Sequence, residues 1–400
     1  MTLRVDLMTR EYPPEVYGGA GVHVEYLARE LARLPAAPDV RVHCFGAERD
    51  AAGVTAYQPS AELADANAAL RVMGVDLAMG AGAEGADVVH SHTWYASLGG
   101  HVAKLLHGVP HVVTTHSLEP LRPWKAEQLG GGYALSSWCE RTALESADAV
   151  IAVSAGMRAD VLRCYPRVEP DRVTVVHNGI DTEEYAPDTG IDVLGRLGID
   201  PDRPSVVFVG RITRQKGLPF LLRAAQGLDG DVQLVVLAGA PDTAEIGAEV
   251  SGLVAKLRAG RDGVVWVDRM LPKSDVIQVL SHATVFCCPS VYEPMGIVNL
   301  EAMACETAVV ATATGGIPEV VADGETGLLV PIDQADDGTG TPRDPDRFVA
   351  DLHDALAAVL ADPSRAVAMG EAGRRRAIET FGWSVIAERT RDVYASLVGA

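Results

Sequence analysis

The chain has 400 residues, of which 48% are hydrophobic and 22% are charged, and its formal net charge is -20. This length and apolar content are typical of a globular protein with two or three domains and a large buried core. Nucleic-acid binding needs basic patches, and the sequence has no long Lys/Arg run, so we expect no nucleic-acid partner.

The six cysteines are scattered and form no C-x-x-C pair. This usage is typical of a reducing compartment and argues against a disulfide framework or a structural zinc site. No apolar stretch approaches the ~20 residues of a membrane-spanning helix. We therefore expect a cytoplasmic protein that does not insert into a membrane.

Short apolar runs alternate with helical stretches through the first half of the chain. The predicted strands are 3–8, 40–45, 88–90, 111–115, 149–153 and 173–176. This alternation predicts an α/β domain with a parallel sheet covered by helices. In such sheets ligands bind outside the carboxyl ends of the strands. The polar residues expected at those ends are His90, His92, His116, Ser154 and Asn178.

A glycine-rich turn follows the first predicted strand and precedes a helix with apolar residues at helical spacing. It contains Gly18, Gly19 and Gly21. Such a βα turn can approach a phosphate group at the start of the helix. The third glycine of the dinucleotide fingerprint is missing, since residue 24 is Val24, and this disfavours an NAD enzyme.

Ser154 lies between a predicted strand and a predicted helix, in a run that nearly matches the nucleophile elbow G-x-S-x-G. The first glycine of that motif is absent. We therefore interpret Ser154 as the N-cap of the helix 155–164.

The regular pattern loosens after residue 182, where prolines and glycines accumulate. We predict a first Rossmann-like domain over 1–185, a linker over 186–203 and a second Rossmann-like domain over 204–375. The last segment, 376–400, is predicted as an amphipathic helix that packs towards the first domain, with a break near Gly382.

The second half repeats the alternation. Its predicted strands are 206–209, 234–237, 264–267, 285–288, 308–311 and 328–330. A turn from Gly210 to Gly217 follows the first of them and carries Arg211 and Lys216. Arg makes bidentate phosphate contacts and Lys is a mobile point charge. Both residues are therefore candidates for binding an anion at a strand end.

A helix preceded by Pro294 and Gly296 carries the main candidate site. The turn leaves the first helical amides, of Ile297 and Val298, uncapped, which favours anion binding. Glu293 and Glu301 have the spacing E-x7-E. At about 1.5 Å rise per helical residue they cannot share one ligand atom, but they can hold two parts of a long ligand. Taken singly, each glutamate would be an ordinary loop or surface charge.

Two Rossmann-like halves with G-R-x4-K-G and E-x7-E in the second resemble the GT-B retaining glycosyltransferases. The family is the one that holds glycogen synthase, sucrose synthase and the phosphatidylinositol mannosyltransferases. The motifs 176–181 (V-H-N-G-I-D) and 315–319 (G-G-x-P-E) add to the likeness, which covers nearly the whole chain. The opening run 10–24 is similar to the actinobacterial-type glycogen synthases. Members of that branch transfer glucose from ADP-glucose to glucose 1-phosphate, giving maltose 1-phosphate, or to an α-glucan.

The resemblance implies two domains that face each other across a cleft, with the C-terminal helix returning to the first. It also implies roles for single residues. Gly18 and Gly19 would approach the donor pyrophosphate from the first domain, with Asn178 among the donor-binding residues. Arg211, Lys216 and the amides after Gly296 would neutralise the pyrophosphate. Glu301 would hold the ribose hydroxyls, Glu293 the glucose hydroxyls, and His116 would lie at the transferred sugar. No metal or other cofactor is implied.

The acceptor side departs from the starch-type pattern. Val16 stands where those enzymes have the lysine of K-x-G-G, and 90–95 reads H-S-H-T-W-Y instead of H-x-H-D-W-H. This favours a small acceptor over polymer elongation, and Arg122 and Lys125 are candidates for binding its phosphate.

Several alternatives stay open. They are a hexosyltransferase that uses a UDP- or GDP-sugar, a sugar-nucleotide epimerase of the same fold, and a glucan phosphorylase that contains pyridoxal phosphate. The sequence also leaves the oligomeric state open, a homodimer included.

Overall fold

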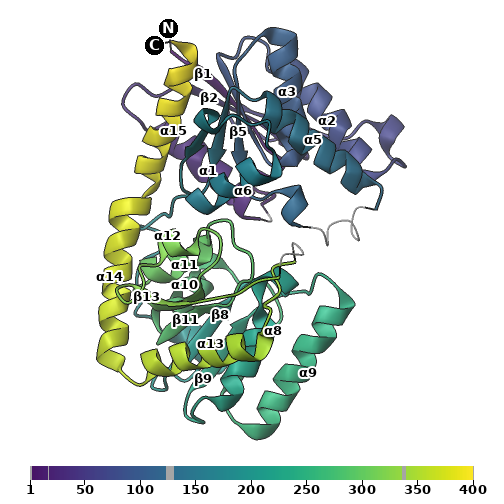
Figure 1. Cartoon of the computed structure of the whole chain (residues 1–400). Helices are drawn as coiled ribbons and strands as arrows, with labels where there is room; N and C mark the ends of the chain where they lie inside the picture. Colours follow the sequence, from purple (N-terminus) through teal and green to yellow (C-terminus); the bar gives the residue numbers. More distant parts are fainter. Residues whose placement is uncertain (1, 17, 123–129, 336–338, 400) are drawn as a thin grey trace. The chain divides into compact units, whose positions relative to one another are not determined.

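The computed structural model describes residues 2–16, 18–122, 130–335 and 339–399. The chain divides into two units (Figure 1): unit 1 comprises 1–179 and 383–400, and unit 2 comprises 180–382. The stretch 186–203, predicted as a linker, belongs to unit 2, where helix α7 (Asp192–Leu197) buries two apolar side chains. The break at Gly382 separates helix α14 (Pro363–Phe381) of unit 2 from helix α15 (Trp383–Val398) of unit 1.

Unit 1 is built, in its described residues, on a seven-stranded parallel sheet in the order β3-β2-β1-β4-β5-β6-β7. The strands are β1 (Arg4–Met8), β2 (Asp39–Phe45), β3 (Val54–Tyr57), β4 (Val88–His92), β5 (His111–Thr115), β6 (Ala149–Ala152) and β7 (Val173–Val175). The predicted parallel sheet is confirmed. The prediction omitted β3, whose four partly exposed residues form no apolar run.

Successive side chains of each strand point to opposite faces of this sheet, and helices cover both faces. Val5 and Leu7 pack with residues of helices α1 (Gly19–Leu31) and α15, whereas Met8 packs with residues of α2 (Ala68–Gly82) and α3 (Trp94–His107). Two further helices among the described residues of the unit are α5 (Gly132–Ser146) and α6 (Ala155–Cys164). Ser154 accepts the Met157 N–H at 2.9 Å, so the predicted N-cap of α6 is confirmed.

Unit 2 repeats the architecture with the strand order β10-β9-β8-β11-β12-β13, again parallel. Its strands are β8 (Ser205–Val209), β9 (Gln233–Leu237), β10 (Val264–Val267), β11 (Val285–Cys288), β12 (Ala308–Thr312) and β13 (Gly327–Val330). Its other helices are α8 (Leu218–Ala224), α9 (Ala244–Gly260), α10 (Lys273–Ser281), α11 (Ile297–Ala304), α12 (Ile317–Val320) and α13 (Pro345–Leu360). Renumbered within each unit, both orders begin 3-2-1-4-5-6, which is the Rossmann order.

Each sheet therefore has one point where the strand order reverses, between β1 and β4 in unit 1 and between β8 and β11 in unit 2. Loops leave such a switch point in opposite directions, so the carboxyl ends of the two strands border a crevice that can hold a ligand. The loops that follow these four strands are the first places to look for a site.

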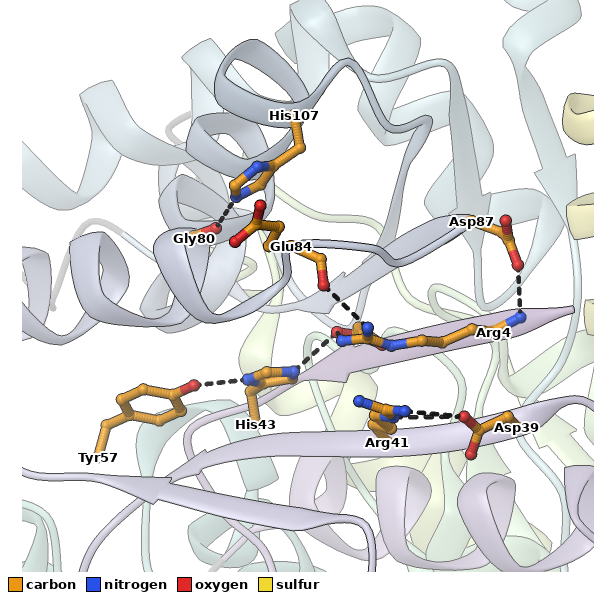
Figure 2. A network of polar contacts seen from close by, with 10 residues as sticks. Arg4, Asp39, Arg41, His43, Tyr57, Gly80, Glu84, Asp87 and His107 are labelled. Atoms are coloured by element: carbon orange, nitrogen blue, oxygen red, sulfur yellow. Dashed lines mark hydrogen bonds and ion pairs between the residues drawn. The ribbon is translucent and has the colours of Figure 1, made fainter.

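A different polar network ties β1, β2 and β3 together away from those loops (Figure 2). Buried Asp6 contacts Arg4 at 2.8 Å and the Nε2 of His43 at 2.9 Å, and the Nδ1 of His43 meets the Tyr57 hydroxyl at 2.8 Å. Arg4 also donates to the carbonyl of Glu84 at 2.8 Å. Both nitrogens of His43 have partners, which makes His43 part of the sheet's framework.

Among the described residues, no helix combines the length and the apolar character needed to cross a bilayer.

Candidate active site

Backbone contacts join the two loops at the switch point of unit 2. Gly217 has φ +65°, and a side chain there would overlap the carbonyl oxygen of Pro289. The Val291 N–H donates to the carbonyl of Gln215 at 2.9 Å, and the Gln215 side chain donates to the carbonyl of Tyr292, also at 2.9 Å. The turn after β8 is thereby held directly against the loop after β11, because glycine permits both the left-handed conformation and the close approach.

This attachment brings Lys216 and Glu293 together. The Lys216 Nζ lies 2.6 Å from the Glu293 Oε2, and the side chains are only 20% and 10% exposed. Ser290 donates to the same carboxylate oxygen at 3.2 Å. Burial alone would lower the pKa of Lys216, but the Glu293 carboxylate outweighs burial and the pKa is raised. Lys216 is therefore a charged ammonium, and two of its three N–H donors are not needed for this contact.

The glycine turn before α12 fixes the backbone of Glu293. Gly315 has φ +56°, and a side chain there would overlap the Glu293 carbonyl, to which Gly316 N–H donates at 3.0 Å. The motif G-G-x-P-E thus supports the first glutamate of E-x7-E from a segment about twenty residues further along the chain. It does so through the backbone, and the positive φ and the close approach explain why residue 315 is glycine.

Helix α11 begins at Ile297, as the sequence predicts, and its N-cap is Gly296 with φ +90° and no side-chain cap. The first amide with a helical partner is that of Asn299, which donates to the Gly296 carbonyl at 2.9 Å. The amides of Ile297 and Val298 precede it, at the positive end of the helix dipole. An uncapped start of this kind favours a phosphate.

Glu301 lies one turn further along α11 and is partly buried. Burial raises the pKa of its carboxyl group, while a hydrogen bond from Tyr185 and the charge of Lys273 act in the opposite direction. The sequence flanks Glu301 with apolar residues, which make a poor place for an unpaired charge. The structure instead provides a tyrosine from the segment before α7.

Arg211 lies on the turn after β8, but its side chain is half exposed and its guanidinium contacts Asp242 at 3.4 Å. The candidate donor residues of unit 2 thus comprise a buried pair, Lys216 and Glu293, and a half-exposed surface cation, Arg211.

The switch point of unit 1 gathers histidines. His92 ends β4, His116 follows β5 and His23 comes from α1. The Nδ1 of His92 lies 3.1 Å from the Nε2 of His116, and the rings of His23 and His116 are 4.8 Å apart. The Nδ1 of His23 lies 2.7 Å from the Oδ1 of Asn178. The strand-end residues His92, His116 and Asn178, predicted separately, thus lie in one group.

Burial controls the charge of this group. It lowers the pKa of His23 to about 4, against a smaller opposing effect of the Asn178 hydrogen bond. The pKa values of His92 and His116 are also far below the usual range, first because of burial and then because the neighbouring imidazoles repel a second charge. All three are neutral imidazoles near pH 7.

His90, another predicted strand-end residue, has a different role. Its Nδ1 contacts the Tyr394 hydroxyl at 2.6 Å and its Nε2 contacts Thr114 at 2.7 Å. With both nitrogens engaged inside the core, His90 attaches helix α15 to the sheet. Sequence position alone did not distinguish His90 from His92.

Gly18 and Gly19 lie at the start of α1, where Gly18 is the N-cap. The Gly18 N–H donates to the Glu11 carboxylate at 2.7 Å, and a side chain at Gly21 would overlap Glu11. This glycine turn is therefore shaped around an acidic side chain of the same loop, a contact that the sequence analysis did not anticipate.

Arg122, a candidate for acceptor binding, forms an ion pair with the fully buried Glu119. Lys125 lies outside the described residues. His23, Ser290 and Gln215 were missed by the sequence analysis. His23 was visible only as a histidine in the first helix after the glycine turn, and neither Ser290 nor Gln215 carries any pattern of its own.

Two family models match the chain, one over most of unit 1 and one over most of unit 2. The model described as Glycosyltransferase Family 4 matches residues 17–184, and the model described as Glycosyl transferases group 1 matches 194–376. The fold and both matches define a glycosyltransferase of the GT-B class, as the resemblance implied.

One relative is the alpha-maltose-1-phosphate synthase of Mycolicibacterium smegmatis, 60% identical over 98% of this chain and 99% of that protein. A second is the D-inositol 3-phosphate glycosyltransferase of Kribbella flavida, 32% identical over 77% of this chain and 70% of that protein. Among solved structures, the sucrose-phosphate synthase of Thermosynechococcus elongatus matches with a TM-score of 0.75 and 26% identity, covering 99% of each chain. The chain belongs to the group 1/family 4 glycosyltransferases.

Proposed function

We propose that this chain transfers glucose from ADP-glucose to glucose 1-phosphate, giving maltose 1-phosphate for α-glucan synthesis. The observation that carries the proposal is 60% identity over the whole chain to a protein named alpha-maltose-1-phosphate synthase. The D-inositol 3-phosphate glycosyltransferase similarity, at 32% identity, also fits a phosphorylated acceptor. Elongation of an α-glucan is the second reaction to test.

The donor diphosphate is proposed to bind at the switch point of unit 2. A leaving diphosphate gains negative charge as the glycosidic bond breaks, and fixed donors aimed at that charge are the strongest catalytic factor available. Lys216 and the amides of Ile297 and Val298 are such donors, with Arg211 as a half-exposed cation on the turn after β8. They supply positive charge from the chain itself, and we propose that transfer needs no metal or other cofactor.

Glu293 is proposed to bind hydroxyl groups of the glucose, and Glu301 those of the ribose. A double displacement would need a free carboxylate as nucleophile. One oxygen of Glu293 is engaged by both Lys216 and Ser290, which supports a binding role. We therefore propose attack on the same face from which the diphosphate departs, with a phosphate oxygen accepting the acceptor's proton.

His116 is proposed to contact the transferred glucose. As a neutral imidazole it can accept one hydrogen bond and donate another, which suits a sugar hydroxyl. Gly18, Gly19 and Asn178 are proposed as donor-binding residues of unit 1.

The expected cytoplasmic location is supported by six cysteines that are all free.

Product analysis tests the proposal. The chain is supplied with ADP-, UDP- or GDP-glucose, and glucose 1-phosphate and glycogen are offered side by side. We expect maltose 1-phosphate from ADP-glucose as the main product. Glucose transfer to glycogen alone would exclude the small acceptor, and a converted sugar without any acceptor would indicate an epimerase.

A further inference from the structure

The three histidines at the switch point of unit 1 have a feature that the proposed transfer reaction does not require. One nitrogen from each of His23, His92 and His116 lies within 4.8 Å of the others. Among the described residues, the histidine, cysteine, aspartate and glutamate side chains form no other group of three or more whose donor atoms lie close enough to hold a metal ion. The rings come from three different elements, so tertiary packing fixes their positions.

The hydrogen bonds around the group leave the required lone pairs accessible. Asn178 Oδ1 only accepts, so His23 donates from Nδ1 at 2.7 Å and keeps the lone pair on Nε2. Such an outer contact orients a metal-binding imidazole and sets its tautomer. No described residue bonds His92 Nε2. The proton between His92 and His116 can therefore move to an outer nitrogen, which frees both inner lone pairs.

His90 and His43 serve as internal comparisons. Both are buried, but each has both nitrogens engaged by partners that hold the ring in the core. His23, His92 and His116 each have a nitrogen that faces the group. The difference lies in hydrogen bonding, since His23 and His92 are as deeply buried as His90 and His43.

The donor set selects the kind of metal. Three imidazoles without a carboxylate suit Zn²⁺ and its neighbours Co²⁺, Ni²⁺ and Cu²⁺, and disfavour Mg²⁺ and Ca²⁺. Zn–N bonds of about 2.0–2.1 Å place tetrahedral ligand atoms roughly 3.3 Å apart. His92 and His116 are already at 3.1 Å, and a shift of up to about 1.5 Å by His23 would bring its nitrogen from within 4.8 Å to the tetrahedral spacing. The fourth position stays open for water or a phosphate oxygen.

We propose that His23, His92 and His116 bind one Zn²⁺ or related transition-metal ion, and that the bound ion blocks glucosyl transfer. The second part rests on the role proposed for His116, because a metal-bound imidazole can no longer accept a hydrogen bond from the sugar. The site would make the enzyme sensitive to free zinc. His116 is only partly buried, so an ion can reach the group from solvent.

Cobalt spectroscopy on the full-length chain tests binding without any activity assay. The EDTA-treated, dialysed protein is titrated with Co²⁺, and the visible d–d bands of tetrahedral cobalt are followed. We expect one Co²⁺ per chain, displaced by one Zn²⁺, without the near-ultraviolet band of a cysteine thiolate. His92→Gln and His23→Gln should each weaken binding at least about tenfold, and Asn178→Ala should do so by about 10–100-fold.

His107→Gln is the matched control. His107 lies on α3 outside the group, where its Nε2 contacts the carbonyl of Gly80 at 3.0 Å, and its loss should leave cobalt binding unchanged. Thermal melting of each variant without metal checks that the fold is intact. No stoichiometric cobalt band in the wild type, or an unchanged band in the folded His92→Gln and His23→Gln variants, would overturn the site.

Inhibition is measured separately. Zn²⁺ should stop transfer by the wild type, and EDTA should restore it. Bound zinc without inhibition would overturn the second part of the proposal alone. Absence of transfer in the metal-free enzyme would refute the proposed function and leave the metal site to be judged by the cobalt spectra.

Discussion

The two switch points share one topology but carry opposite chemistry. In unit 2 the loops after the paired strands hold a charged ammonium against a carboxylate at 2.6 Å, beside an uncapped helix start. In unit 1 the carboxyl ends of β4 and β5, together with α1, hold histidines that burial keeps neutral. The same fold therefore offers a site for an anion in one unit and a site for neutral hydrogen-bonding groups in the other.

The neighbours of these side chains explain why one site is charged and the other is neutral. A buried charge is retained only when a counter-charge or several hydrogen bonds compensate the lost hydration. Lys216 has Glu293 beside it, whereas His92 and His116 have mainly each other. Two imidazoles in contact cannot both be charged at low cost, so the group remains neutral. Fold similarity does not predict which chemistry a switch point carries, because single side chains decide it.

Removing the positive charge of Lys216 in unit 2 should have the largest effect on glucosyl transfer. Lys216→Ala should lower kcat/KM by about 10²–10³-fold, as expected for loss of a preorganised donor to developing charge. Steady-state transfer kinetics measure it. Denaturant unfolding of Lys216→Ala and of the double variant with Glu293→Gln, which removes the unpaired buried carboxylate, measures the loss of stability separately from the loss of activity. Arg223→Ala, which breaks a surface pair of the same unit also at 2.6 Å, should be near neutral. Equal effects of the two alanine variants would argue against a special role for Lys216.

Disturbing the contact between the loops that follow β8 and β11 should have the second-largest effect. Gly217→Ala places a side chain at φ +65° against the Pro289 carbonyl, and should reduce the free energy of unfolding by about 3 kcal/mol. Denaturant unfolding measures it. Gly252→Ala in α9, where a side chain meets nothing within 4 Å, should be neutral or stabilise by up to about 1 kcal/mol. The idea fails if both alanines behave alike.

The stability of unit 1 should depend on pH in the acid range through His23. Since the pKa of His23 falls from 6.5 to about 4 on folding, the unfolded chain takes up this proton first. Its contribution to stability is complete above pH 6.5 and is lost as pH falls towards 4, on the order of 3 kcal/mol. Calorimetry in EDTA should show His23→Gln to be less sensitive to acid over this window than the wild type. Parallel curves would mean that His23 is not held neutral.

Ser290 should give the smallest effect. Its hydroxyl supports the Glu293 carboxylate at 3.2 Å, and Ser290→Ala should cost about 1 kcal/mol. We expect this as a several-fold rise in the donor KM with kcat nearly unchanged. A loss as large as that of Lys216→Ala would show that Ser290 acts directly on the reacting groups.

Sequence motifs were most informative in unit 2. Lys216, Glu293 and Gly296 were predicted because each lies within a few residues of a strand end, and turns and helix starts are local structures with recognisable residue types. In unit 1 the histidines at strand ends were identified, but His23 on α1 was missed. Nothing local indicates that a helical histidine meets two strand ends, since that contact depends on how α1 packs on the sheet.

The sequence by itself determined the two parallel sheets, the glycine turns and the uncapped start of α11, because periodicity and backbone preference act over a few residues. Only the tertiary structure decided which polar groups are partners. It paired Lys216 with Glu293 across 77 positions and His23 with Asn178 across 155. It also placed Tyr394 on His90, 304 residues away. Charge and tautomer depend on burial and on such distant neighbours, and these exist only after the chain has packed.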